Sequence, residues 1–209
     1  MKLFLLLLIV IFIIVLVLRY FNKKSDVEAT AIELQRYLPE VFVVADIETT
    51  GLDPEKHEII EIAAIRVRRD SDIHDTFSAL VKPSKKIPKK ITEITGITDD
   101  MLQKDGEPIE ETMKQFISFI GNHRLVFYNA PFDMSFLNKS ARQVGIVIEN
   151  PISDALEIAR IAWPNRRSYK LVDLAKDANL STVMHHRAIK DCELTMRIFC
   201  AAAIDAKRI

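Results

Sequence analysis

The chain has 209 residues, of which 49% are apolar and 28% charged, which suits one folded domain with an appendage. The formal net charge is zero, but four of the 29 basic side chains lie in residues 1–24, which contain no acid, so the rest of the chain carries 25 basic and 29 acidic side chains. This balance excludes binding of a polyanion through overall charge alone; a nucleic-acid partner would require local basic patches and bound metal.

Cys192 and Cys200 lie on one predicted helix, too far apart for a disulfide, and are expected to be packing residues.

The chain begins with an apolar run of 16 residues, from Leu3 to Leu18. As a helix it would be about 24 Å long, slightly shorter than a bilayer's hydrocarbon core of about 30 Å, and Tyr20 and Phe21 suit the membrane interface. A cleaved signal peptide is the alternative, but its apolar core usually has about 7–15 residues, and no small-residue cleavage site follows this run. We therefore expect a single-pass transmembrane anchor over residues 1–21, with the rest of the chain in the cytoplasm because more basic residues follow the run than precede it.

The remaining chain divides into a linker over residues 22–39, with a short amphipathic helix that ends at Pro39, and one domain over residues 40–209. Strands are predicted over 41–47, 58–67, 75–81 and 125–128, and helices over 108–120, 132–144, 153–162, 170–178 and 188–206. Residues 82–100 are expected to form a loop rich in lysine and proline. Because strands come first and then alternate with helices, the pattern favours an α/β sheet covered by helices.

Two acidic residues end the first predicted strand. Asp46 and Glu48 are two positions apart, so both point to one face of a strand, at the carboxyl end where open α/β sheets place their sites. Taken alone, this pair is more simply interpreted as a turn-forming aspartate and a surface glutamate. Asp133 follows the 125–128 strand and falls in the first turn of a helix, where an acid also stabilises the helix dipole.

A histidine and an acid complete the set. His186 and Asp191 are five positions apart, about 140° from sharing a face on one helix, so they converge only if His186 lies on a loop and Asp191 on the helix that follows. An imidazole with a pKa near 6.5 could then take a proton from water. A surface histidine is the simpler interpretation when His186 is considered alone.

Four carboxylates near one another cannot all ionise without cations, because like charges raise one another's pKa. Two divalent ions about 4 Å apart would neutralise them, and such pairs catalyse in-line displacement at phosphorus. The constellation therefore favours hydrolysis of phosphodiester bonds.

Three ordered motifs resemble those of the DEDDh-type 3′→5′ exonucleases, the superfamily of proofreading exonucleases. They read VVADIETTGLDPEKHEIIEIAAIRV, LVFYNAPFDMSFL and HRAIKDCELTMRIF. The stretches ITEITGITDDML and SYKLVDLAKDANL also resemble the family, and the match spans about residues 41–200. The N-terminal anchor and linker are not part of the family's shared core.

The resemblance implies a ribonuclease-H-like α/β fold with a central mixed five-stranded sheet, here preceded by one transmembrane helix. It implies two Mg²⁺ or Mn²⁺ ions, held by Asp46, Glu48, Asp133 and Asp191, with His186 as the base that deprotonates water. The expected partner is DNA or RNA with a free 3′ end, from which nucleoside 5′-monophosphates are released; the membrane is a second partner, through the N-terminal helix.

The resemblance also implies residues that cradle the terminal nucleotide: Thr49, Thr50, Gly51 and Leu52 in one loop, and Gly96, Ile97 and Thr98 in another. Leu52 and Ile97 could wedge against the terminal base or pack in the core. The lysines of the 82–90 stretch could follow phosphates or form a solvated loop.

Two other classes of protein remain as alternatives. An inactive member that binds nucleic acid or a partner would be expected to lack one of the five residues, and all are present. A Ca²⁺-binding membrane protein would need closely spaced oxygen ligands in one loop, and no such loop is evident. The sequence does not separate DNA from RNA, and it identifies no protein partner.

Overall fold

The computed structural model describes residues 38–69, 71–183 and 186–206. The predicted anchor over residues 1–21 and nearly all of the predicted linker over 22–39 lie outside these ranges. Among the helices of the described ranges, none is both long enough and apolar enough to cross a membrane.

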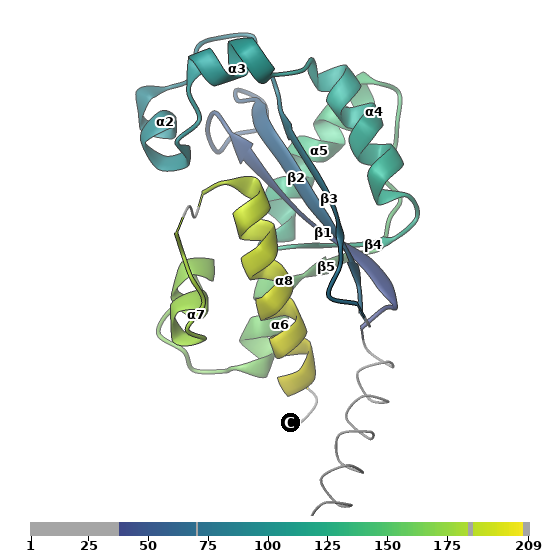
Figure 1. The fold of residues 1–209 in the computed structure, drawn as a ribbon, viewed down its shortest axis with the longest axis vertical. Coiled ribbons are helices and arrows are strands. Elements are labelled where there is room, and N and C mark those ends of the chain that lie inside the picture. Colours follow the sequence, from purple (N-terminus) through teal and green to yellow (C-terminus); the bar gives the residue numbers. More distant parts are fainter. Residues whose placement is uncertain (1–37, 70, 184–185, 207–209) are drawn as a thin grey trace, which may run out of the picture. The chain divides into compact units, whose positions relative to one another are not determined.

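The described part of the domain is built on a mixed five-stranded sheet with the order β3-β2-β1-β4-β5 (Figure 1). The strands are β1 (Val41–Thr49), β2 (Ile59–Arg68), β3 (Asp75–Leu80), β4 (Arg124–Phe127) and β5 (Ile152–Asp154). The first three pair antiparallel, whereas β4 pairs parallel to β1 and β5 parallel to β4. The predicted mixed sheet is confirmed, and β1 occupies its centre.

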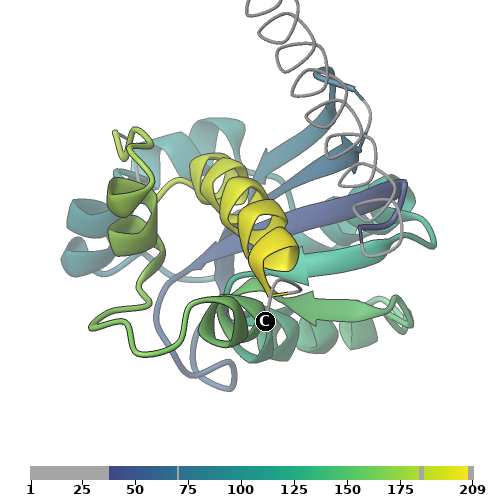
Figure 2. The ribbon, with the colours of Figure 1, turned by 90° about the horizontal axis from the view of Figure 1, so that it is seen from below.

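Helices cover both faces of the sheet. They are α2 (Lys89–Thr95), α3 (Asp99–Asp105), α4 (Ile109–Ile120), α5 (Ala130–Gln143), α6 (Ala155–Ala162), α7 (Leu171–Asp177) and α8 (Ala188–Asp205). On one face α8 lies across β1 and β2, with α6 and α7 packed beside it (Figures 1 and 2). On the other face α4 and α5 pack in a core with the strands.

The side chains of β1 point alternately to the two faces of the sheet, and this determines which face its acidic residues share. Val43, Ala45 and Ile47 are buried in the core with α4 and α5. Phe42, on the opposite face, lies against Phe199 of α8, with 5.5 Å between ring centroids. Because successive side chains alternate along a strand, the even-numbered residues of β1 face α8.

Two predicted segments were wrong. The expected loop over 82–100 contains α2 and the start of α3, because Pro88 begins a helix and Ile87, Ile97 and Leu102 pack together in a small core with Ile60. The expected helix start at 153 is instead the end of β5, a strand of three residues that is too short to produce a recognisable alternation.

Candidate active site

The site forms where the end of β1 meets the start of α8. Asp46 and Glu48 lie on the face of β1 that α8 covers, and Asp191 lies in the first turn of that helix. Ligand atoms of Glu48, His186 and Asp191 all lie within 4.8 Å of one another. Asp191 shares the core-facing stripe of α8 with Thr195 and Ile198, which explains why its carboxylate is buried.

His186 reaches this cluster because it lies outside the helix. Its backbone has a φ of 67°, in the left-handed region, and α8 begins only after its N-cap, Arg187. The His186 backbone N–H donates to Asp191 Oδ2 at 3.1 Å. The turn thus brings together two side chains that a continuous helix would hold apart.

Asp133 comes from the other side of the sheet, in the first turn of α5. Its side chain is buried, and among the described residues its Oδ2 has no hydrogen-bond partner. Burial raises the pKa of Asp133 well above its ordinary value, and the charges of Asp154 and Glu48 raise it further. A buried carboxylate oxygen without a hydrogen-bond donor is costly unless a cation balances it.

The carboxylates strongly affect one another. Burial, followed by the charges of Asp133, Asp191, Glu48 and Glu61, raises the pKa of Asp46 well above its ordinary value. Burial, followed by Asp191 and Glu61, raises the pKa of Glu48 to about 8. At neutral pH this protein cannot hold all these groups ionised by itself, so its oxygen-rich cluster suits divalent cations.

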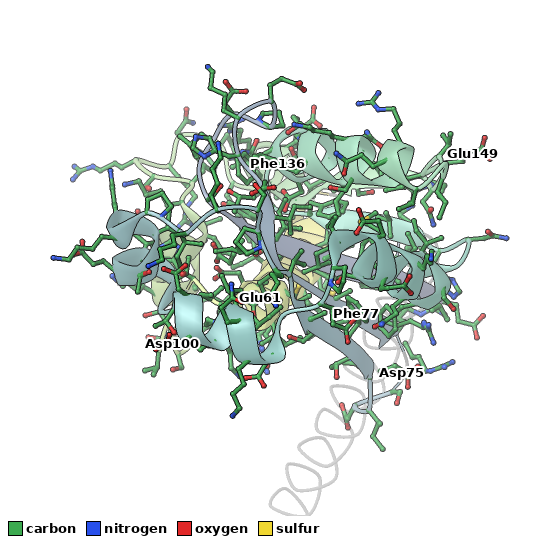
Figure 3. The ribbon with its side chains drawn as sticks, turned by 90° about the horizontal axis from the view of Figure 1, so that it is seen from above. Glu61, Asp75, Phe77, Asp100, Phe136 and Glu149 are labelled. Atoms are coloured by element: carbon green, nitrogen blue, oxygen red, sulfur yellow. The ribbon has the colours of Figure 1, made fainter. Side chains whose placement is uncertain are left out.

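Sequence reasoning missed two residues beside the cluster, Glu61 and Arg187. Glu61 is the cross-strand partner of Glu48, is fully buried, and lies at the middle of the view in Figure 3. Arg187 Nη2 donates to Glu61 Oε1 at 2.7 Å, its Nε lies 3.2 Å from both carboxylate oxygens, and the Ala188 N–H donates to Oε2 at 3.0 Å. A single acid inside the apolar run IIEIAAI was the available signal, because a buried charge requires a partner.

The residues predicted to cradle a nucleotide lie at the end of β1 and in the turn that follows it, and in a second loop. After a bulge at Glu48/Thr49, the Thr49 hydroxyl donates to the Gly51 carbonyl at 2.6 Å, and Leu52 is 83% exposed. A Cβ at Gly51 would lie about 2.5 Å from the His57 ring, so a larger residue at this position would displace that ring. Leu52 is therefore available to a ligand.

The second loop joins α2 to α3. Gly96 ends α2 with a φ of 71°, and the Thr98 side chain accepts a hydrogen bond from Met101 N at the start of α3. Ile97 is 0% exposed, so of the two expectations for its side chain this structure has core packing. The lysines at 85, 86, 89 and 90 are exposed, as in a solvated stretch.

Comparisons with known proteins show the family of this domain. A family model described as Exonuclease (RNase_T) matches residues 43–199. The PolC-type DNA polymerase III of Clostridium perfringens is 41% identical over 158 residues, and that of Bacillus subtilis is 39% identical over 169 residues. The matches cover 75% and 80% of this chain but 11% and 12% of those polymerases, so the chain spans about a tenth of their length.

Solved exonuclease structures share the fold. Escherichia coli exonuclease I in complex with a dT13 oligonucleotide aligns with a TM-score of 0.70 at 21% identity, covering 81% of this chain and 42% of that one. Exonuclease X in complex with 5′ overhanging duplex DNA aligns with a TM-score of 0.61 at 26% identity, covering 80% and 91%. The predicted ribonuclease-H-like exonuclease fold is confirmed, and exonucleases of this kind use divalent metal ions. The chain belongs to this exonuclease family, whose members hydrolyse phosphodiester bonds, and the predicted membership of the 3′→5′ exonucleases is confirmed.

Proposed function

We propose that this chain removes nucleoside 5′-monophosphates from the 3′ end of a DNA strand, with two Mg²⁺ or Mn²⁺ ions held by Asp46, Glu48, Asp133 and Asp191. The observation that carries the proposal is the convergence of Glu48, His186 and Asp191 within 4.8 Å, beside the partly buried Asp46 and the buried Asp133. Two ions would neutralise carboxylates that otherwise repel one another.

His186 acts as the base. It takes a proton from the attacking water as the new bond from water oxygen to phosphorus forms and the bond from phosphorus to the 3′-oxygen breaks. The leaving 3′-oxygen gains its proton from solvent. Divalent ions bound by the carboxylates would activate water and stabilise the charge on the leaving oxygen. The hydrogen bond from His186 N to Asp191 Oδ2 keeps the base beside the metal ligands.

DNA is the favoured substrate because of what the similar proteins are. The curated relatives are DNA polymerases, and the structures of exonucleases I and X hold DNA. The terminal nucleotide would meet the loop of Thr49, Thr50, Gly51 and Leu52, where Leu52 is exposed. Gly96, Ile97 and Thr98 would contribute backbone groups only, since Ile97 is buried and Thr98 caps α3.

The order of the predicted segments suggests that the enzyme is attached to a membrane: an apolar N-terminal run, a linker over 22–39 and a domain over 40–209. We propose that residues 1–21 anchor it in a membrane with the catalytic domain in the cytoplasm; support comes from the 16-residue apolar run and the basic residues that follow it. The full chain should then stay with the membrane fraction after an alkaline wash, and a chain lacking residues 1–24 should not. Release of the full chain by that wash would contradict the anchor.

The activity is tested with the full chain in detergent on 5′-labelled DNA and RNA strands, each with a free or a blocked 3′ end. We expect metal-dependent shortening of free-ended DNA, release of 5′-monophosphates, slower loss of RNA, and protection by the 3′ block. Faster loss of RNA would reverse the substrate assignment. Tight binding without cleavage under Mg²⁺ and Mn²⁺ would instead favour an inactive nucleic-acid-binding protein.

A further inference from the structure

A basic groove extends from the catalytic histidine along α6 and α7. Its volume is about 790 Å³, and His186 forms part of its wall. The other lining residues come from the residues that follow β4, from α6, and from the segment that leads into α7; among them are Tyr128, Arg160, Arg167, Ser168, Tyr169 and Lys170. The groove is therefore continuous with the cluster of Glu48, His186 and Asp191.

The charge of the groove has one sign. Arg160, Arg167 and Lys170 are exposed in its wall, and no acid lines it. Within the described ranges none of the three cations forms an ion pair. In a domain with more acidic than basic side chains, this is a local basic surface where a polyanion would bind.

The nearest acids are occupied elsewhere. Asp154 accepts hydrogen bonds from Asn129 N at 3.0 Å and Leu156 N at 2.9 Å. Asp173 accepts the Ser168 hydroxyl at 2.5 Å, and Asp177 is ion-paired with Arg166. The partners of these acids are therefore residues other than Arg160, Arg167 and Lys170.

The wall is held by hydrogen bonds that do not involve the three cations. The Tyr128 hydroxyl donates to the Tyr169 carbonyl, and the Tyr169 hydroxyl donates to the Trp163 carbonyl at 2.6 Å. The Arg160 guanidinium lies 5.9 Å from the centre of the Tyr169 ring. Because α6, α7 and α8 share a buried core, Arg160 on α6 and Lys170 at the start of α7 have fixed backbone positions, and Arg167 lies in the segment between these two helices.

We propose that this groove binds the phosphates on the 5′ side of the scissile bond in a single strand, through Arg160, Arg167 and Lys170. The inference rests on the proposed function. A strand cut one nucleotide from its 3′ end has one phosphate at the reaction, which must lie at the carboxylate cluster. Every other phosphate lies on the 5′ side, so three further cations beside the cluster match that part of the strand. The groove then sets a minimum substrate length and the salt dependence of binding.

The test compares substrates with different numbers of phosphates, using the full chain in detergent. The p-nitrophenyl ester of thymidine 5′-monophosphate has one phosphate, whereas a thymidine hexanucleotide has several on the 5′ side. The variants are Arg160→Gln and the pair Arg167→Gln with Lys170→Gln. We expect the ratio of kcat/KM for the hexanucleotide to kcat/KM for the ester to fall by up to about fivefold per cation removed. The slope of log affinity against log salt should fall by about 0.7 per cation.

Matched variants remove the same charge elsewhere. Lys114→Gln, an exposed lysine on α4, should leave the ratio unchanged, and the pair Lys85→Gln with Lys86→Gln tests the lysine-rich stretch as the rival path. A fall in the ratio for Lys85 and Lys86 but not for the groove residues would overturn the proposal. Equal losses on ester and hexanucleotide would also overturn it, because the groove residues would then act on the reaction or on folding rather than on the strand.

Failure of the proposed function gives a different pattern. If the wild-type chain hydrolyses neither substrate in Mg²⁺ or Mn²⁺, the exonuclease proposal fails. Binding of the labelled hexanucleotide in Ca²⁺ then decides the groove separately. Binding that weakens in the groove variants and not in Lys114→Gln supports the groove, and binding that is absent or indifferent to those variants overturns it.

Discussion

Arg187 and Glu61, 126 positions apart, are joined by three contacts: Arg187 Nη2 lies 2.7 Å from Glu61 Oε1, and Arg187 Nε lies 3.2 Å from each carboxylate oxygen. Glu61 is the neighbour of Glu48 across the sheet, and Arg187 follows His186 directly. The ion pair therefore fixes the start of α8 against β2, and with it the positions of His186 and Asp191 relative to Glu48. We interpret Glu61 as a positioning residue.

Replacing Glu61 by glutamine should lower kcat by about ten- to a hundredfold with little change in KM, because the base and the metal ligands lose alignment while the strand contacts remain. The free energy of unfolding should fall by about 1–3 kcal/mol, since Arg187 keeps a partly buried charge without its counterion. Kinetics and thermal melts measure both effects. Adding Arg187→Gln should restore part of the stability but not kcat; full recovery of kcat would contradict a positioning role.

Removal of the proposed base should separate catalysis from metal binding. His186→Ala should lower kcat by about 10²–10⁴-fold, because general-base catalysis contributes this much, while all four proposed carboxylate ligands are retained. Calorimetric titration with Mn²⁺ should give near wild-type affinity. His123→Ala, in the turn before β4, is the matched control. An unchanged kcat in His186→Ala would exclude the histidine as the base.

The buried Asp133 should oppose folding when metal is absent. Its carboxyl group is buried, and its Oδ2 has no hydrogen-bond partner within the described residues, so Asp133→Asn removes a cost of ionisation. We expect the variant to melt at a higher temperature than wild type in EDTA, and its stabilisation by Mg²⁺ to be smaller. Glu149→Gln, at the periphery of the domain in Figure 3, should change neither value. A larger stabilisation by Mg²⁺ in Asp133→Asn would contradict a metal-holding role.

The raised pKa of Glu48 predicts how stability depends on pH without metal. Between its ordinary value of 4.5 and the folded value of about 8, the unfolded chain releases a proton that the folded chain retains. The contribution of Glu48 to the free energy of unfolding is therefore greatest below pH 4.5. It falls by about 1.4 kcal/mol per pH unit until about pH 8. The raised pKa values of Asp46 and Asp133 act in the same direction.

Thermal melts in EDTA from pH 5 to pH 9 measure this slope. Saturating Mg²⁺ should remove or reverse it, because metal binds the ionised carboxylates and binds more tightly as the pH rises. Glu48→Gln should flatten the slope in EDTA. A melting temperature that rises from pH 5 to pH 8 in EDTA would show that the carboxylates are not mutually destabilised.

The sequence predicted the elements whose pattern is long and regular. The apolar runs at 41–47 and 58–67 and the amphipathic 108–120 stretch are close to β1, β2 and α4. By contrast, β5 has three residues and exists because it pairs with β4, which no local pattern reveals. The sequence did not indicate helix α2 because its lysines are exposed; only the folded chain shows that Ile91 of this helix packs against the small core that contains Ile60.

The candidate site was predictable at the positions where the residue type and its spacing indicate a chemical role. The spacing of Asp46 and Glu48, and the need for a turn between His186 and Asp191, follow from strand and helix geometry. Glu61 and Arg187 belong to a pair formed across 126 positions, and only the folded chain shows that they meet. The three groove cations were also not predictable as a group, because Arg160, Arg167 and Lys170 come together only after α6 and α7 pack beside α8.

The central claim is that the carboxylate cluster binds the divalent ions on which exonuclease activity depends. The most direct measurement is a calorimetric titration of the chain with Mn²⁺, made beside the rate of 3′-end shortening at each metal concentration, for wild type and Asp191→Asn. We predict two saturable sites in wild type, activity that follows their filling, and loss of both in Asp191→Asn. Full activity in Asp191→Asn, or activity without bound metal, would contradict the account.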